Sequence, residues 1–374
     1  MRIGIDLLWV RPGICGGTES YIRNLMDGFG KFDSVNEYLL FVTQDNEDSF
    51  AGYANYPQME LAVCNTLCAS QAKRILWENL HLDRTARARK IDLMFIPVYS
   101  KPFTGRRYPI PYVSVIHDLQ ALHYPQYFSW ARRMFQKFMW RHACMTSRRV
   151  IAISEYCRRD LILHFPSVEK KSLVIYNPVV TSDSELPFNE LEEKYHIKKD
   201  CYLYCVSSML PHKNLSTLLK AMAALREYDF NMPLVLSGVG GERDKFVAVA
   251  KELGVQDRVI DTGYVSDRER DCLYENCKLF LFPSVFEGFG MPPVEAMRRG
   301  KNVVMTRESC LEEVTRGKAV YVDKPYNPEE WCDRIRYALT LQGNKYVFPE
   351  YETEWVVKEY LRTFRDCLGK GGAG

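Results

Sequence analysis

The fold of this chain is decided by one stretch of sequence, Pro283-Ser284-Val285-Phe286-Glu287-Gly288-Phe289-Gly290-Met291-Pro292-Pro293-Val294-Glu295-Ala296-Met297. Its order predicts the end of a strand, a glycine-punctuated loop and the start of a helix, because tandem prolines suit a first helical turn. A helix start reached through a glycine-rich loop favours anions, since free N–H groups point at the ligand. Glu287 and Glu295 can accept hydrogen bonds from sugar hydroxyls beside that anion. The stretch therefore predicts a nucleotide-sugar site.

The same string resembles the E-x7-E signature of retaining glycosyltransferases of family 4, which have the GT-B fold. The likeness rests on Pro-Ser before Glu287, on Gly288, Phe289 and Gly290 after it, and on Glu-Ala-Met from Glu295. The alternative is an acidic loop that only caps a helix, but capping does not require two glycines. The resemblance implies that Glu287, Gly288, Phe289, Gly290 and Glu295 bind the donor. Glu287 would contact the transferring sugar, and Glu295 would contact the ribose hydroxyls.

Length and composition indicate a two-domain globular protein. The chain has 374 residues, a length that exceeds what one hydrophobic core can organise, so two domains are expected. Its hydrophobic content of 47% fits a globular protein with an ample core. No apolar run approaches the roughly 20 residues of a membrane span, and the first residues indicate a strand and not a signal peptide. The 12 cysteines are scattered without paired zinc spacing. We therefore expect reduced core thiols, a cytoplasmic location and no metal site.

Charge is distributed unevenly along the chain. Residues 1–180 contain 23 Lys and Arg against 16 Asp and Glu, whereas residues 181–374 contain 27 against 31. The basic first half predicts an acidic partner, either an anionic membrane surface or a phosphate-bearing acceptor. No nucleic-acid partner is expected.

Alternating strand and helix patterns predict an α/β fold of two Rossmann-like doubly wound domains facing an interdomain cleft, which is the GT-B architecture. The expected divisions are an acceptor-side domain over 1–180, a nucleotide-sugar domain over 181–350, and a segment 351–374. That last segment contains a helix at Glu352–Leu368, crossing back to the first domain, and a disordered tail from Gly369. The polar stretch Thr181–Asn189 is expected to be a linker. The main expected strands and helices of the first domain are strands Ile3–Leu8, Tyr38–Thr43, Leu93–Pro97, Tyr112–His117 and Val150–Ser154, and helices Tyr21–Phe29, Ala72–Arg89, Trp130–Arg148 and Glu155–His164. Those of the second are strands Tyr202–Ser207, Leu234–Gly238, Arg258–Thr262, Leu279–Pro283, Asn302–Thr306 and Val320–Asp323, and a helix over Leu215–Glu227.

A lysine in the second half occupies a phosphate-facing position. Lys213 follows the first expected strand and precedes the first helix, where its point charge can neutralise a diphosphate. The family usually has an arginine before this lysine, but Ser207, Ser208 and Met209 stand in that region here. Two further loops that end strands resemble donor-binding loops of the family; they contain Gly238 and Val265. A plain turn remains the alternative for the glycine.

Two motifs in the first half resemble family loops. Gly16 and Gly17 open a helix after the first strand, where backbone can approach a phosphate closely. His117 ends a strand in a His-Asp-Leu segment, and the resemblance implies that it contacts the transferring sugar or the acceptor. The ordinary pKa of histidine also suits a role in proton transfer. The helix over residues 130–149 combines aromatics with arginines. It fits either an anionic membrane surface or a core helix with a solvated basic face, and both alternatives stay open.

The resemblance therefore implies a retaining hexosyltransferase with His117, Lys213 and Glu287 as its catalytic residues. The expected donor is a nucleotide-sugar, first GDP-mannose and then UDP-sugars, since the motifs look most like mannosyl- and rhamnosyltransferases of surface-polysaccharide pathways. The expected acceptor is a glycan or lipid-linked saccharide at the inner face of the membrane. No cofactor is expected, because lysine and N–H groups neutralise the phosphates. The alternatives are a non-catalytic sugar-binding protein on the same fold and a GT-B nucleotide-sugar epimerase or phosphorylase.

Overall fold

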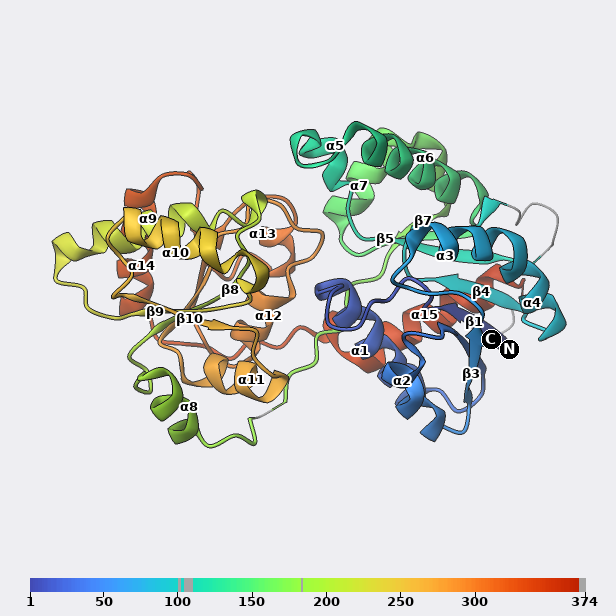
Figure 1. Cartoon of the computed structure of the whole chain (residues 1–374), viewed down its shortest axis with the longest axis horizontal. Helices are drawn as coiled ribbons and strands as arrows, with labels where there is room; N and C mark the ends of the chain where they lie inside the picture. The colour runs from blue at the N-terminus through green and yellow to red at the C-terminus, as the bar shows by residue number, and fades with distance from the viewer. Residues whose placement is uncertain (100–101, 104–109, 183, 370–374) are drawn as a thin grey trace. The chain divides into compact units, whose positions relative to one another are not determined.

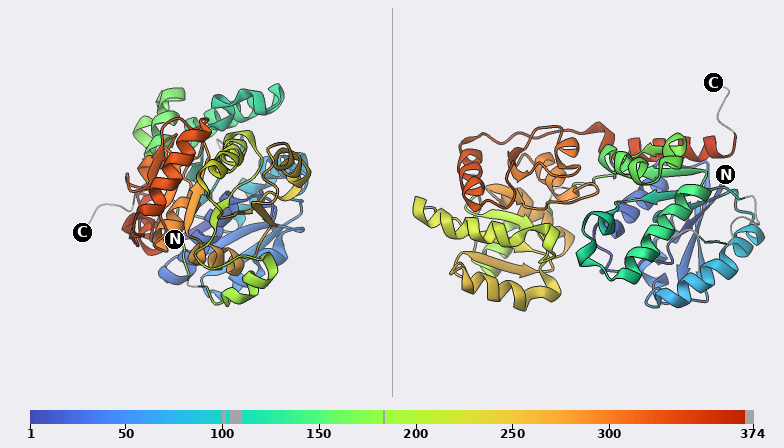
Figure 2. Two further views of the ribbon diagram at one scale, coloured as in Figure 1. Left: turned by 90° about the vertical axis from the view of Figure 1, so that its left-hand side faces the viewer. Right: turned by 90° about the horizontal axis from the view of Figure 1, so that it is seen from above.

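The chain forms two compact units, each built on its own parallel sheet. The structure is a computed structural model that describes residues 1–99, 102–103, 110–182 and 184–369. The first unit contains Met1–Pro178 together with Pro349–Gly374, and the second contains Val179–Phe348. In each unit, helices cover both faces of the sheet (Figures 1 and 2). These two α/β units confirm the predicted fold class.

The first unit has a seven-stranded parallel sheet in the order β3-β2-β1-β4-β5-β6-β7. Its strands are β1 (Arg2–Asp6), β2 (Glu37–Thr43), β3 (Met59–Cys64), β4 (Leu93–Ile96), β5 (Tyr112–Ile116), β6 (Arg149–Ala152) and β7 (Ser172–Val174). Its α-helices are α1 (Gly17–Phe32), α2 (Glu47–Phe50), α3 (Gln71–Trp77), α4 (Asp83–Ala88), α5 (Gln120–His123), α6 (Trp130–Thr146), α7 (Glu155–His164) and α15 (Thr353–Cys367). The order reverses between β1 and β4, so the loops that leave these strands diverge and open a crevice at the carboxyl edge.

The second unit repeats the arrangement with six strands in the order β10-β9-β8-β11-β12-β13. The strands are β8 (Leu203–Val206), β9 (Leu234–Ser237), β10 (Val259–Gly263), β11 (Leu279–Phe282), β12 (Val303–Thr306) and β13 (Val320–Val322). The α-helices are α8 (Phe188–Tyr195), α9 (Leu215–Ala224), α10 (Arg243–Glu252), α11 (Asp267–Asn276), α12 (Met291–Arg298), α13 (Leu311–Val314) and α14 (Pro328–Thr340). Here the order reverses between β8 and β11.

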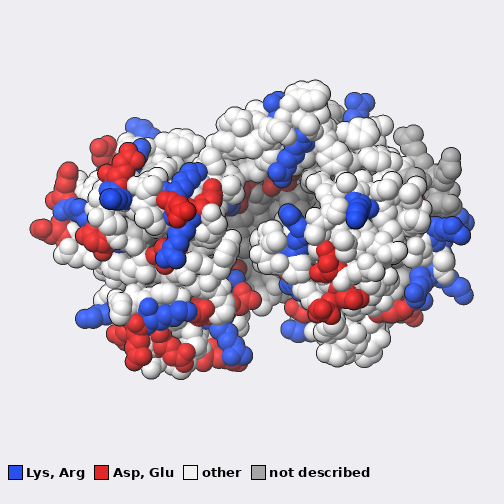
Figure 3. Space-filling view, viewed as in Figure 1, with Lys and Arg blue, Asp and Glu red and all other residues white. Residues whose placement is uncertain are grey.

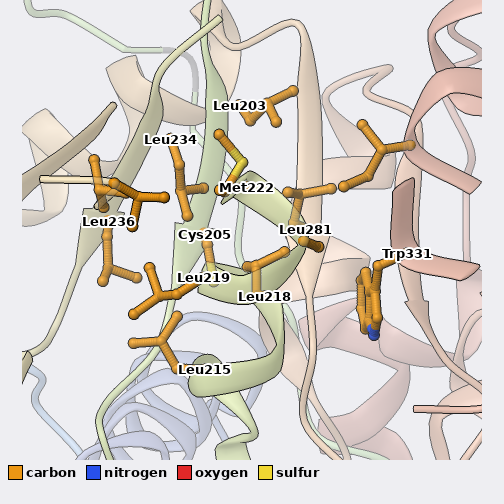
Figure 4. Packing of buried hydrophobic residues seen from close by; sticks show 14 of the residues in the cluster. Leu203, Cys205, Leu215, Leu218, Leu219, Met222, Leu234, Leu236, Leu281 and Trp331 are labelled. Atoms are coloured by element: carbon orange, nitrogen blue, oxygen red, sulfur yellow. The ribbon is translucent and has the colours of Figure 1, made fainter. Parts of the chain in front are cut away.

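The core of the second unit fixes the loops at that reversal. Leu218, Leu219 and Met222 of α9 pack with Leu281 of β11 and Trp331 of α14, all fully buried (Figure 4). Apolar runs such as the Leu-Phe-Leu-Phe of β11 suit a strand that is covered on both faces. The strands are therefore anchored immediately before the loops that carry the predicted site residues.

The C-terminal helix belongs to the first unit. Its ribbon α15 runs beside α1 (Figure 1). The hydroxyl oxygens of Tyr21 on α1 and Tyr360 on α15 are 2.6 Å apart, and Phe364 is also fully buried. The periodicity of this helix also predicts Trp355 on its apolar face, but that side chain is 53% exposed. The disordered tail is predicted from Gly369 onward. Gly369 is described, and the rest of the tail lies outside the described residues.

Three details of the predicted secondary structure are wrong. The helix expected over Ala72–Arg89 is α3 and α4 separated by a π-helical turn at Glu78–Leu82, which begins at the buried Glu78. The linker expected over Thr181–Asn189 already contains the start of α8 at Phe188. The edge strands β3 and β7 were not predicted, because one mixes exposed and buried positions and the other is only three residues long.

Candidate functional site

The loops after β8 and β11 bring two predicted residues together in the second unit. Lys213 Nζ donates to Glu287 Oε1 at 2.6 Å, and the two side chains are 24% and 14% exposed. Since β8 and β11 are neighbours at the reversal of strand order, this pair lies where doubly wound sheets bind ligands. It places one positive and one negative group at the edge of the predicted donor site.

A short turn sets the position of Lys213. Pro211–Lys213 form a 3-10 turn, after which Asn214 adopts the left-handed conformation with φ 51°. His212 points inward, and its carbonyl accepts the Val285 N–H at 2.8 Å, which ties the β8 loop to the β11 loop. Burial, followed by the charge of Lys213, lowers the pKa of His212 to about 4, so this ring is neutral at pH 7. The lysine therefore supplies the charge of the turn.

The glycine loop around Glu287 is held by its own contacts. The Glu287 N–H donates to Ser309 Oγ at 3.0 Å, and Cys310 Sγ donates to the carbonyls of Glu287 and Phe289 at 3.2 and 3.3 Å. The Phe289 side chain is 2% exposed, so it packs in the core; only its backbone could reach a donor. Gly290 has φ 84°, which suits glycine at this helix start. The loop thus presents the Glu287 carboxylate to Lys213.

Glu295 is partly buried on α12 and has different neighbours from Glu287. Burial raises the pKa of its carboxyl, and the charge of Arg270 with the Tyr274 hydroxyl only partly opposes the rise. Burial alone would lower the pKa of Arg270, but the carboxylates of Glu295 and Asp267 outweigh it and raise that pKa. Sequence reasoning missed Arg270, because it lies in the polar start of a capped helix and only the fold brings it to Glu295.

At the predicted glycine loop after β9, the backbones at the ends of three neighbouring strands lie close together. Gly238 has φ 97°, and its N–H donates to the Gly263 carbonyl at 2.9 Å. A Cβ at Gly238 would lie 3.1 Å from the Ser207 carbonyl oxygen. Val265 follows the same edge and is half-buried. Gly238 therefore serves backbone packing at the carboxyl edge, whatever it contacts in a donor.

A lysine from α10 reaches the loop where the family's arginine is missing. Lys245 Nζ lies 3.4 Å from the Met209 carbonyl oxygen, next to Ser207 and Ser208. It is a second cation at this edge of the sheet that sequence reasoning did not find. On the face of the second unit drawn in Figure 3, acidic and basic side chains are interspersed.

The first unit has a pocket of about 420 Å³ at the carboxyl edge of its sheet. Loops after β1, β4 and β5 line it, as do the inner faces of α3 and α6. Gly16, which has φ 54°, and Gly17 start α1 between two lining residues, Cys15 and Thr18. His117 lines the pocket directly. The predicted first-domain residues therefore gather around one cavity.

His117 is neutral in this setting. Its Nε2 lies 2.8 Å from the Pro97 carbonyl oxygen, so Nε2 is the protonated nitrogen, and its ring meets Tyr21 edge-on at 5.0 Å. Burial lowers the pKa of His117 to about 4, and the Pro97 carbonyl only partly offsets this. A ring of this kind is an uncharged hydrogen-bonding group at pH 7 and a weak base.

Three positive side chains line this pocket, and only Arg132 belongs to a segment that the sequence analysis singled out, the basic helix over residues 130–149. Arg11, Arg74 and Arg132 all line it, from the β1 loop, α3 and α6 respectively. Aromatic side chains line it as well, and these include Tyr99 and Trp140, whose rings meet edge-on. Guanidinium groups beside aromatic rings suit an anionic sugar-bearing ligand. The signal is three-dimensional, because these residues are far apart in sequence.

Comparison with known proteins identifies both halves of the chain. Residues 15–183 match the family model described as Glycosyltransferase Family 4, and residues 187–355 match the model described as Glycosyl transferases group 1. The O-antigen chain mannosyltransferase B of Escherichia coli is 27% identical over 234 residues, which is 61% of each chain. The O-antigen chain mannosyltransferase RfbU of Salmonella typhimurium is 27% identical over 225 residues, which is 59% of each. The alignments thus span less than two thirds of these relatives.

Solved structures agree on the fold. The Anabaena protein HepE, solved in complex with UDP-glucose, superposes with a TM-score of 0.70 at 19% identity, over 99% of this chain and 98% of that one. The matched models leave only short stretches at the ends and at residues 184–186 uncovered. The chain therefore belongs to the glycosyltransferases of family 4 and group 1, with the GT-B fold.

Proposed function

We propose that the protein transfers a hexose, with retention of anomeric configuration, from a nucleotide-sugar to a hydroxyl of a glycan or lipid-linked saccharide. GDP-mannose is the proposed donor, because the two relatives above are O-antigen mannosyltransferases. The observation that carries the proposal is the Lys213–Glu287 pair at the carboxyl edge of the second sheet. One member suits a leaving diphosphate, and the other suits a sugar that becomes positively charged.

The proposed chemistry is electrostatic. The bond between the anomeric carbon and the diphosphate oxygen breaks, and Lys213 stabilises the charge that gathers on the departing phosphate. Glu287 stabilises the positive charge that develops at the sugar. The acceptor hydroxyl attacks from the face that the diphosphate leaves, and its proton passes to the departing phosphate oxygen. With Lys213 supplying the cation, a divalent metal is not part of the proposal.

Glu295 and His117 have binding roles in this proposal. Glu295 accepts hydrogen bonds from the ribose hydroxyls, which replace part of the hydration that burial removes. His117 contacts the sugar or the acceptor as a neutral ring, because its pKa of about 4 leaves it uncharged at pH 7. A role as proton donor does not fit that pKa.

The first-unit pocket supports an anionic acceptor. Its arginines suit a phosphate, and its aromatic rings suit sugar faces. On the outer side of α6, Trp130, Met134 and Phe138 form a stripe at helical spacing that is 72%, 42% and 56% exposed, beside Lys137 and Arg141. An exposed apolar stripe flanked by cations suits an anionic bilayer surface. Among the described helices, none is long and apolar enough to cross a membrane. We propose peripheral attachment at the cytosolic face.

A non-catalytic sugar-binding protein is the second candidate. Two observations favour it: the missing arginine before Lys213, and the carboxylate that already neutralises this lysine. Such a protein would bind a nucleotide-sugar without releasing the nucleotide. An epimerase would instead release product without needing an acceptor.

Nucleotide release measured with a panel of donors tests the proposal. The protein is incubated with GDP-mannose, UDP-glucose or dTDP-rhamnose, with and without a lipid-diphosphate-linked acceptor. Acceptor-dependent release of GDP, lost in Lys213→Gln, is expected, and proton NMR of the product should show the donor's anomeric configuration. Tight donor binding without release would establish the binding protein, and inverted product would overturn retention.

A further inference from the structure

A buried carboxylate lies between two histidines in the first unit. Asp160, on α7, is 9% exposed; its Oδ2 lies 2.8 Å from Nε2 of His123, and its Oδ1 lies 3.4 Å from Nε2 of His164. The two histidine side chains are 32% and 36% exposed. Two imidazole nitrogens thus converge on one carboxylate from the solvent side.

The fold creates this convergence from two elements. Asp160 and His164 are four residues apart on α7, so they share one face of the helix. His123 ends the short helix α5 and comes from a separate part of the chain. The two rings are nearly perpendicular, at 80°, with centroids 6.0 Å apart, so they do not stack on each other. Each ring instead turns its Nε2 toward the carboxylate.

The three side chains match the ligand set of a zinc-class ion. One ligand atom from each lies within 4.8 Å of the others. Around a tetrahedral ion with bonds of about 2.0–2.1 Å, ligand atoms are about 3.3 Å apart. The 3.4 Å separation of His164 Nε2 from Oδ1 already fits, whereas His123 Nε2 lies 2.8 Å from the other oxygen, Oδ2, so binding of one ion by all three side chains needs a small shift of this pair. Imidazole with carboxylate favours Zn²⁺ over Mg²⁺ or Ca²⁺.

We propose that His123, Asp160 and His164 form a binding site for a divalent zinc-class ion, with water in the remaining position. The site is structural, because it links α5 to α7. The helix α5 follows His117 and Asp118 almost directly, and the Cys157 thiol of α7 donates to the His117 carbonyl at 3.1 Å. An ion there holds the wall of the first-unit pocket that contains His117. This role is independent of the proposed glycosyl transfer.

Metal binding to the untagged full-length chain tests the site. The protein is stripped with a chelator and titrated with Zn²⁺ by calorimetry, then with Co²⁺ while visible absorption is recorded. One ion per chain with tetrahedral Co²⁺ bands is expected. Loss of a residue that only supports a metal ligand typically weakens metal binding by roughly 10–100-fold. His164→Ala and Asp160→Asn each remove a ligand, so they should weaken Zn²⁺ binding by at least this factor. The matched control is His196→Asn, which removes an exposed imidazole elsewhere at a left-handed position that asparagine tolerates.

Thermal unfolding provides a second readout that does not depend on spectroscopy. An ion that binds the folded chain raises the unfolding temperature by mass action. The shift with Zn²⁺ should occur in the wild type and in His196→Asn and be absent in His164→Ala. Circular dichroism checks that each variant is folded, and His123→Ala replaces any variant that is not. Failure of the wild type to take up Zn²⁺ would overturn the proposal, as would equal uptake by a folded His164→Ala or His123→Ala.

Discussion

Lys213 Nζ lies 2.6 Å from Glu287 Oε1, although the residues are 74 apart in sequence. The side chain proposed to meet the diphosphate and the side chain proposed to meet the sugar therefore neutralise each other. A bound diphosphate has to share Lys213 with this carboxylate. Loss of Glu287 and loss of Lys213 should therefore have different effects on diphosphate binding and on turnover.

Replacing Glu287 with glutamine should tighten nucleoside diphosphate binding and slow turnover. The variant frees Lys213 from a charge-assisted hydrogen bond, so GDP or UDP should bind up to about tenfold more tightly. Turnover should fall by about 100-fold, because the carboxylate no longer faces the developing positive charge. Calorimetry with the diphosphates and kcat with the sugar donor measure the two effects. Weaker diphosphate binding in this variant would contradict the competition.

Replacing Lys213 with glutamine should weaken diphosphate binding by roughly 10–100-fold, the effect of one charge-assisted hydrogen bond. Lys245→Gln is the matched control, because this lysine also reaches the edge of the sheet but has other partners, the Met209 carbonyl at 3.4 Å and the Glu242 carboxylate at 3.8 Å. We expect the control to lose less than about threefold. An equal loss in both variants would show that Lys245 has taken the place of the family's missing arginine.

The pH dependence of stability should contain a contribution from His117. Its pKa is about 4 in the folded chain against about 6.5 when unfolded, so the unfolded state binds more protons between these values. The contribution is fully present above pH 6.5 and is lost as the pH falls through 4. Between pH 7.5 and 4.5, the wild type should lose about 2–3 kcal/mol more unfolding free energy than His117→Gln.

Urea unfolding of the first unit at the two pH values measures this difference. Glutamine keeps an N–H donor for the Pro97 carbonyl, so the variant should fold. Taking variant minus wild type cancels other titrating groups, such as Asp6, whose pKa burial raises to about 6. His196→Asn, at an exposed site, should follow the wild type. Identical pH profiles for the wild type and His117→Gln would show that His117 is not desolvated.

Much of the fold is predictable from local sequence patterns. Apolar runs such as Leu279–Phe282 mark strands buried on both faces, and their order along the chain matches two doubly wound sheets. The π-helical turn at Glu78 is not predictable in this way. It accompanies the burial of Glu78, which raises the pKa of its carboxyl; the nearby charge of Asp6 on β1 adds to the rise and that of Arg74 opposes it. Arg74 is a helix neighbour of Glu78, but the proximity to Asp6 exists only after the sheet forms.

The candidate site likewise contains residues that the sequence predicts and residues that it does not. The glycine-rich loop predicts Glu287, and the position of Lys213 between a strand and a helix predicts the lysine, because such loops and helix starts leave a local signature in the sequence. Arg270 and Arg74 leave none, since each is an ordinary helix residue until the fold turns it toward Glu295 or the first-unit pocket. Local patterns therefore find the loops of a site more readily than the charges that converge on it.

Replacing Gly290 with alanine should destabilise the second unit by about 2–3 kcal/mol. The residue has φ 84°, and an added Cβ would lie 2.8 Å from Cδ2 of the fully buried Leu311. The matched control is Gly317→Ala, where φ is 69° but no atom lies within 4 Å of the added Cβ. The control should cost only the backbone strain of about 1 kcal/mol. Urea unfolding of the second unit measures both, and equal losses would show that Leu311 moves aside.

Removing the two aromatic side chains of the exposed apolar stripe of α6 should weaken vesicle binding. Trp130 and Phe138 are 72% and 56% exposed, and burying both rings in a bilayer interface supplies several kcal/mol. Trp130→Ala with Phe138→Ala should reduce co-sedimentation with phosphatidylglycerol vesicles at least tenfold, and the binding of the wild type should weaken in high salt. Val35→Ala, at an 83% exposed apolar site of the same unit, is the control and should bind as the wild type does. Unchanged binding by the double variant would exclude α6 as the membrane contact, whereas equal binding to neutral vesicles would exclude the contribution of Lys137 and Arg141.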